Sequence, residues 1–152
     1  MDKIDKKILK VLANNARINN VKMSKIIKLT APATMQRIRR LQNSGIILGF
    51  KTIFDKKKLG KGLTCFMAIT VKSEMENAAG DLIENQLKKF SEIEEIHFLT
   101  GRYDCLIKLH VRDVDDLREF MFKKLTKLEA FSHVETFISL SSIDNANFNL
   151  IE

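Results

Sequence analysis

The amino-acid sequence predicts an α+β fold in two parts, and three observations support this prediction. Apolar residues recur at helical spacing through residues 2–44, whereas residues 63–143 alternate strand-like and helical segments in the order βαββαβ. The charge balance also changes between the two parts: residues 1–60 carry 15 Lys and Arg with 3 Asp and Glu, and residues 61–152 carry 11 with 16. Such an asymmetry is typical of a nucleic-acid-binding module joined to a different module.

Three short helices are predicted in residues 2–44. Asp2 is placed to cap the first helix, which ends at the polar residues 14–17, and Asn19 is placed to cap a second, short helix. The second and third helices are separated by about three residues, which is the spacing of a helix-turn-helix.

The third helix has clear start and stop residues. Thr30 is a good N-cap, Pro32 falls in the first turn where its missing N–H costs little, and Gly45 is the expected left-handed stop. Its predicted buried stripe has the spacing i, i+4, i+7 and consists of Thr34, Ile38 and Leu41. No acidic residue occurs between Asp5 and Asp55, so this helix lies in a segment of unopposed positive charge.

The remaining elements give three predicted regions: a winged helix-turn-helix domain at 1–49, a linker strand and hinge at 50–62, and a βαββαβ domain at 63–152. The wing is predicted as a strand pair in residues 46–54, and the tail after residue 143 as loose or swapped. The βαββαβ order implies one antiparallel four-stranded sheet with two helices on one face, a ferredoxin-like (ACT-like) arrangement. Strands are predicted at 63–72, 93–100, 105–111 and 134–143, and helices at 77–89 and 113–128.

Several classes of protein and site are disfavoured. No apolar run is long enough to span a membrane, and the N-terminus mixes acids and lysines, unlike a signal peptide. Cys65 and Cys105 lie in strand-like apolar runs and are expected to be buried, reduced thiols. We expect no metal site, no cofactor and no catalytic residues, because the cysteines lack metal-ligand spacing and the histidines fall on separate elements.

Five segments in this order resemble the Lrp/AsnC (feast/famine) family of transcriptional regulators. They are "DKIDKKILKVLANNAR", "LTAPATMQRIRRLQNSGII", "LG" at 59–60, "TGRYDCLIKLHV" and "VETFISLSSI". The resemblance covers about residues 2–143. It implies a DNA-binding helix-turn-helix, a ligand-sensing domain that responds to a small amino-acid effector, and homodimers joined through their sheets and often assembled into octamers. It also implies a cytoplasmic, nucleoid-associated protein. Lys28 stands where the family commonly has a glycine, so the turn is expected to be strained or built differently.

The third helix supplies the candidate DNA-binding residues. Gln36 can pair with adenine through two hydrogen bonds, and Arg37 can pair with guanine or hold a phosphate. Arg39 and Arg40 lie further along and are expected to touch the DNA backbone. Short residues at the helix tip let the helix approach base edges closely. Thr30 and the amides of the first turn can hold a phosphate at the positive end of the helix dipole. These tip residues are Thr30, Ala31, Pro32 and Ala33.

The effector site implied by the resemblance lies near the turn 101–104. Gly101 lets a backbone approach a small ligand, Asp104 is suited to accept from an α-amino group, and Tyr103 to cover a side chain. Arg102 is suited to receive a carboxylate. Val134 and Thr136 match positions that line the family site. A purely structural role for this turn stays open, and so do two other functions: a low-specificity architectural DNA-binding protein, and a cofactor-free decarboxylase of siroheme-type tetrapyrroles.

Overall fold

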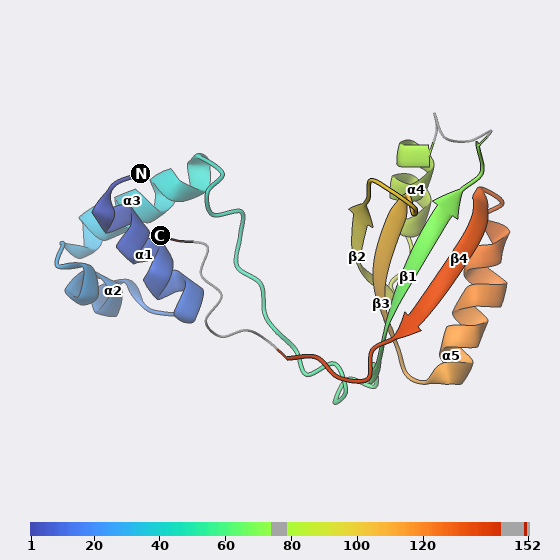
Figure 1. The fold of residues 1–152 in the computed structure, drawn as a ribbon. Coiled ribbons are helices and arrows are strands. Elements are labelled where there is room, and N and C mark those ends of the chain that lie inside the picture. Colours follow the sequence, from blue (N-terminus) through green and yellow to red (C-terminus); the bar gives the residue numbers. More distant parts are fainter. Residues whose placement is uncertain (74–78, 144–150, 152) are drawn as a thin grey trace. The chain divides into compact units, whose positions relative to one another are not determined.

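The computed structural model describes residues 1–73, 79–143 and 151. The chain divides into two compact units, one containing Met1–Ile53 and the other Phe54–Ile143 (Figure 1). The first two residues of the helix predicted at 77–89, and the tail prediction, fall on residues outside the described ranges. No helix in the described ranges is long and apolar enough to cross a membrane.

The N-terminal unit contains the three predicted helices, α1 (Lys3–Asn14), α2 (Asn20–Ile27) and α3 (Ala31–Asn43). The predicted N-caps are confirmed, because the side chains of Asp2, Asn19 and Thr30 accept hydrogen bonds from the first-turn amides of these helices. The helices pack around a small apolar core of buried side chains, to which the predicted stripe of α3 contributes. The core consists of Ile8, Met23, Ile27, Ile38 and Leu41.

Two residues of this unit have left-handed backbones. Gly45 has φ +73° and ends the last turn of α3, as predicted. Lys28 has φ 63° and ψ 44°, so the turn between α2 and α3 keeps the left-handed geometry without a glycine. A left-handed non-glycine residue is strained by about 1–2 kcal/mol, so Lys28 stores strain in this turn.

The predicted strand pair at 46–54 is wrong. Residues 46–54, all of which the structure describes, contain no strand and expose large apolar side chains, including Leu48, Ile53 and Phe54. The segment has strand-like composition but lacks a neighbouring strand to supply hydrogen bonds, and an isolated pair of strands is marginally stable in water.

The second unit is the predicted antiparallel sheet. Its strands are β1 (Leu63–Val71), β2 (Ile93–Phe98), β3 (Cys105–Val111) and β4 (Phe131–Ile138), in the spatial order β2-β3-β1-β4. Helices α4 (Ala79–Leu87) and α5 (Val114–Glu119) cover the same face of the sheet (Figure 1). Both cysteines are buried and free, as predicted for thiols in strands.

Several predicted boundaries in this unit are corrected, and the second strand ends at Phe98 and not at residue 100. The last strand runs over 131–138 and not 134–143, because its register with β1 runs from Val71 opposite Phe131 to Cys65 opposite Ile138. The helix predicted at 113–128 does begin at an Asp113 N-cap, but after α5 it continues as a π-helical turn, Phe120–Lys124, and a 3-10 turn, Leu125–Lys127.

The predicted hinge contains an ordered loop. In residues 55–61 the amide of Lys58 donates to Asp55, the amide of Lys61 donates to the carbonyl of Lys56 at 2.8 Å, and Gly60 has φ +72°. Lys56 also reaches the sheet, where its ammonium group lies 2.6 Å from Glu94. This part of the linker therefore belongs to the second unit.

Candidate nucleic-acid interface and effector site

The exposed face of α3 carries a polar stripe. Pro32, Gln36, Arg39 and Asn43 recur at intervals of four and three residues, opposite the buried stripe, and all four are exposed. Among the described residues, the side chains of Gln36, Arg39 and Asn43 have no hydrogen-bond or ion-pair partner, and so they are free to meet a ligand. Asn43 was not among the sequence candidates, although the helical spacing from Gln36 and Arg39 could have identified it.

Arg37 lies on a different face of α3 and points to α1. Its Nη1 atom lies 2.6 Å from Asp2 Oδ2 and 2.9 Å from Asp5 Oδ1, and Arg40 Nη2 lies 2.7 Å from Asp5 Oδ2. The side chain of Arg37 is 26% exposed and that of Arg40 is 60% exposed. Four charged groups from two helices thus form an ion cluster, which we call the Asp5 cluster.

The carboxylate of Asp5 is the centre of this cluster. Asp5 is 1% exposed, and it also accepts a hydrogen bond from the backbone amide of Asp2 at 3.2 Å, so both of its oxygens are used. Burial acts to raise the pKa of Asp5, but the hydrogen bonds from Asp2 and Arg37 outweigh burial and lower that pKa below its usual range. The Arg37 guanidinium lowers the pKa of Asp2 to about 2.

The positions of the eight sequence candidates therefore differ in what they can contact. Gln36 and Arg39 share the exposed stripe, and Arg40 is partly exposed beside it. Arg37 is held by two carboxylates and serves as a link between helices. At the helix tip, Thr30 uses its hydroxyl oxygen to accept from the amide of Ala33 at 3.3 Å. Pro32 has no amide hydrogen, so few first-turn amides remain to hold a phosphate.

The predicted effector turn is built tightly around Asp104. Its carboxylate accepts from the amide of Val71 at 2.8 Å, and its own amide donates to the carbonyl of Ile69 at 2.9 Å. Gly101 has φ +118°, a backbone that side chains rarely adopt. The Tyr103 hydroxyl donates to Glu135, and the guanidinium carbon of Arg102 lies 5.2 Å from the centre of the Tyr103 ring. Asp104 thus has a structural role in the turn.

The other two effector candidates lie on β4 and face the helices. Val134 pairs with Ile69, and Thr136 pairs with Met67, both on the covered side of the sheet. The Thr136 hydroxyl is buried without a hydrogen-bond partner among the described residues. Val134 lines a cavity of about 450 Å³ together with Leu125, Phe131 and His133. None of residues 101–104 lines this cavity, so one chain does not bring the six candidates together.

Comparisons with known proteins agree with this architecture. The family model described as "Lrp/AsnC ligand binding domain" matches residues 64–147, and one described as "Winged helix-turn-helix DNA-binding" matches residues 1–47. Transcriptional regulator AzlB of Bacillus subtilis is 34% identical over 142 residues, which are 93% of this chain and 90% of that protein. Leucine-responsive regulatory protein of Escherichia coli is 29% identical over 97% of this chain and 89% of its own.

Solved structures show the same fold. The structure of E. coli AsnC superposes with a TM-score of 0.86 and 26% identity, covering 97% of each chain. The transcriptional regulator NMB0573 of Neisseria meningitidis, solved as a complex with L-Met, superposes with a TM-score of 0.89 and 23% identity. That comparison covers 97% of this chain and 94% of the other.

Proposed function

Because this chain belongs to the Lrp/AsnC family of transcriptional regulators, we propose that it binds specific sequences of double-stranded DNA through α3 and is modulated by a small amino acid. The observation that carries the proposal is the exposed stripe of α3. Its Gln36 and Arg39 side chains have no partner among the described residues, and the N-terminal unit has few acidic residues. Gln36 is suited to pair with adenine, and Arg39 with guanine, in the major groove.

This assignment changes one role expected from the sequence. Arg37 is the residue that holds α3 on α1, whereas Arg39 takes the role of base contact. Arg40, with a side chain 60% exposed, is suited to hold a phosphate while keeping its bond to Asp5. Thr30, Ala31, Pro32 and Ala33 form the narrow tip that lets α3 approach the bases.

Selection of bound sequences from random duplexes tests this function, with and without a pool of amino acids. We expect one enriched motif with two-fold symmetry, and a changed affinity when the effector is present. Duplex binding without any enriched motif would support the architectural alternative. Absence of duplex binding even at low salt, where phosphate contacts are strongest, would reject both DNA-binding functions.

The proposed effector is an amino acid bound between dimers, by the turn 101–104 of one chain and β4 of another. The Leucine-responsive regulatory protein and the NMB0573 complex with L-Met, by their names, support this ligand class. The Thr136 hydroxyl, which is buried and has no hydrogen-bond partner in the described part of the chain, supports a polar contact near Val134. Arg102 and Tyr103 complete the proposed site from the turn.

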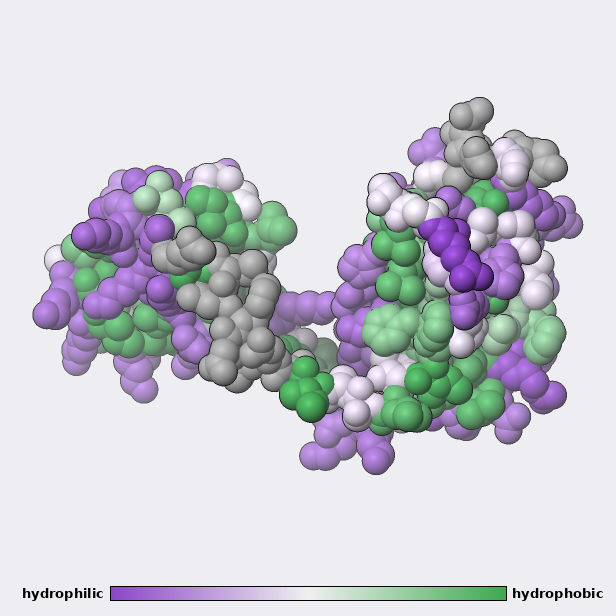
Figure 2. All heavy atoms as spheres, in the orientation of Figure 1, coloured by the Kyte–Doolittle hydropathy of each residue, from purple (hydrophilic) through white to green (hydrophobic). Residues whose placement is uncertain are grey.

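The uncovered sheet face is the proposed dimer surface. The strand register places Phe66 beside Phe137, and Ala68 beside Leu106, on the side opposite the helices. Figure 2 shows hydrophobic atoms gathered over this face of the sheet. Phe137 is 47% exposed in one chain. Exposed aromatic residues on a contiguous apolar surface are typical of protein–protein interfaces. We propose homodimers formed here, which assemble further into octamers.

Replacing Phe137 with glutamate is expected to break this dimer, because a charge would be desolvated within the interface. Analytical ultracentrifugation measures the outcome. Phe122→Glu is the matched control, since Phe122 is 68% exposed on the π-helical turn on the other side of the sheet. A Phe137→Glu protein that sediments like the unmodified chain would contradict the proposed surface.

We further propose that the protein acts in the cytoplasm, with the nucleoid, and without catalysis. Two of its three histidines, His97 and His110, are held by Glu95 and Glu94 at 3.1 and 2.7 Å, which supports roles other than catalysis for them. A haem-like absorbance after mixing with a siroheme-type tetrapyrrole would instead favour the decarboxylase alternative.

A further inference from the structure

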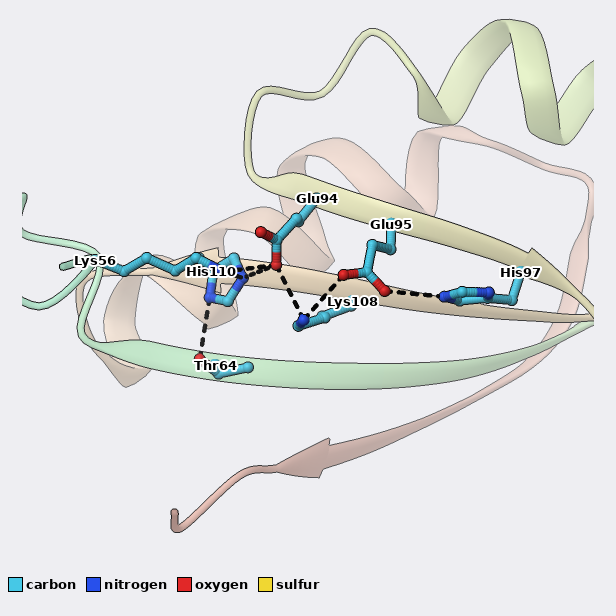
Figure 3. Close-up of polar contacts among 7 residues, drawn as sticks. All are labelled: Lys56, Thr64, Glu94, Glu95, His97, Lys108 and His110. Carbon is cyan, nitrogen blue, oxygen red and sulfur yellow. Dashed lines mark hydrogen bonds and ion pairs between the residues drawn. The ribbon is translucent and has the colours of Figure 1, made fainter. Parts of the chain in front are cut away.

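A polar cluster joins the linker loop to the open face of the sheet (Figure 3). The carboxylate oxygen Oε2 of Glu94 lies 2.6 Å from Lys56 Nζ, 3.1 Å from Lys108 Nζ and 2.7 Å from His110 Nε2. These contacts lower the pKa of Glu94 to about 2, the hydrogen bond from Lys56 being the largest cause. Glu94 therefore stays ionised and attracts each of the three cation-forming groups.

One ring nitrogen of His110 faces both a hydrogen-bond acceptor and a hydrogen-bond donor. Its Nε2 atom lies 2.7 Å from the Glu94 carboxylate and 2.8 Å from the Lys56 ammonium, while its Nδ1 atom lies 3.0 Å from the Thr64 hydroxyl. A carboxylate only accepts hydrogen bonds and an ammonium only donates them. One ring nitrogen therefore cannot satisfy both partners in the same protonation state.

The neutral imidazole favours the closed arrangement. Its Nδ1–H donates to Thr64 and its Nε2 lone pair accepts from Lys56, which donates to Glu94 as well. Lys56 then has two acceptors, and the loop 55–61 is held on the sheet.

The protonated imidazole favours release of Lys56. Its Nε2–H donates to Glu94, and the imidazolium and the ammonium become like charges about 2.8 Å apart. His110 and Lys108 lie on β3, which is paired with β1 on one side and β2 on the other, and His110 is 8% exposed. Neither side chain can therefore easily move away from Glu94. Lys56 can, because it lies on a loop and its side chain is 39% exposed.

Other charged side chains lie near His110 on β2 and in a neighbouring hollow. On β2, Glu95 binds Lys108 at 3.0 Å and His97 at 3.1 Å, so it does not neutralise the imidazolium. Lys61 and Glu92 line the same hollow of about 270 Å³ as His110, but Glu92 Oε1 binds Lys124 at 2.5 Å. On β1 the facing group is the uncharged Thr64.

We propose that Lys56, Glu94 and His110 form a pH-sensitive latch that fastens the linker loop to the sensing domain and opens when His110 is protonated. Opening lengthens the unattached linker from residues 48–54 to residues 48–62, because the amides of Ile46 and Ile47 donate to the carbonyl of Leu41 and stay with the N-terminal unit. The length of the free linker limits the distance between the DNA-binding unit and the sheet. The latch therefore makes the largest distance that the linker allows depend on pH.

Hydrogen exchange of the full chain, corrected for intrinsic rates, tests the latch through the Lys61 amide. We expect its protection to be about tenfold lower in acid, where His110 carries a second proton, than at neutral or higher pH. His110→Gln should remove this pH dependence, whereas His97→Gln should keep it. Lys56→Met, which retains His110, should give low protection at both pH values, and Lys57→Met should behave like the unmodified chain.

Two results would overturn the proposal. One is a loop whose protection does not change with pH in the unmodified chain. The other is a Lys56→Met protein whose Lys61 amide keeps full protection at the higher pH, which would show that Lys56 does not fasten the loop. The Lys56 variant replaces a partly exposed loop residue, so it tests the latch even if the buried His110 variant does not fold.

Discussion

Replacing Asp5 with asparagine is expected to destabilise the N-terminal unit by about 2–4 kcal/mol, near the lower end of the cost of breaking a buried ion pair because the arginines keep access to water. Asp5 is 1% exposed and binds both Arg37 and Arg40, which lie on another helix. An asparagine fits the space but cannot accept charge-assisted hydrogen bonds from two guanidinium groups. Native-state hydrogen exchange of the amides in α1, α2 and α3 measures the loss.

The same cluster predicts how the N-terminal unit responds to acid. The pKa of Asp2 is about 2 in the folded chain, compared with its usual 3.8, and the pKa of Asp5 is also lowered. Folding therefore favours both ionised carboxylates, and their stabilisation is complete above the usual pKa and is lost as the pH falls from about 4 toward 2. The Asp5→Asn protein should lose less stability over that range.

Asp115→Asn is the matched control for the loss of one negative charge. Asp115 lies in the C-terminal unit, its side chain is 91% exposed, and its partner Arg118 in the same unit is 3.9 Å away. Exchange in the N-terminal unit should be unchanged by it. If Asp5→Asn also left the protection of α1 and α3 unchanged, the Asp5 cluster would not stabilise this unit.

Arg39→Ala is expected to weaken binding to the selected duplex by about 1–3 kcal/mol and to relax the preference at a single base pair, because Arg39 is the free arginine on the exposed stripe of α3. Gln36→Ala should act similarly at a neighbouring base pair. Arg40→Ala should weaken binding to all duplexes alike and reduce the salt dependence by about one phosphate contact. Titration of labelled duplexes at several salt concentrations separates these outcomes.

Arg118→Ala controls for the loss of one positive charge, since Arg118 is 72% exposed on α5 in the other unit. Arg37→Ala gives the decisive comparison. We expect it to loosen the packing of α3 on α1 and to reduce binding to all sequences together. An Arg37→Ala protein that folded normally, yet lost discrimination at one base pair, would show that Arg37 leaves Asp2 and Asp5 to contact a base.

Local signals in the sequence were sufficient for most of the fold. The N-caps at Asp2, Asn19, Thr30 and Asp113 were predictable because a short polar side chain in front of an apolar periodic segment satisfies first-turn amides within a few residues. The order of strands and helices along the chain, βαββαβ, was predictable from the spacing of apolar residues. The predicted strand pair at 46–54 failed because strand-like composition cannot form a strand without a neighbouring strand to supply hydrogen bonds.

The sequence by itself determined the two-part α+β architecture, the family and the basic helix-turn-helix. Only the tertiary structure decided which arginine is free. Arg37 and Arg39 are two residues apart and alike in charge, but the helix turns about 200° between them, so one faces α1 and the other faces solvent. The Asp5 cluster and the Lys56, Glu94 and His110 latch join residues 16 to 54 positions apart. Such pairings depend on how the elements pack, which no local pattern records.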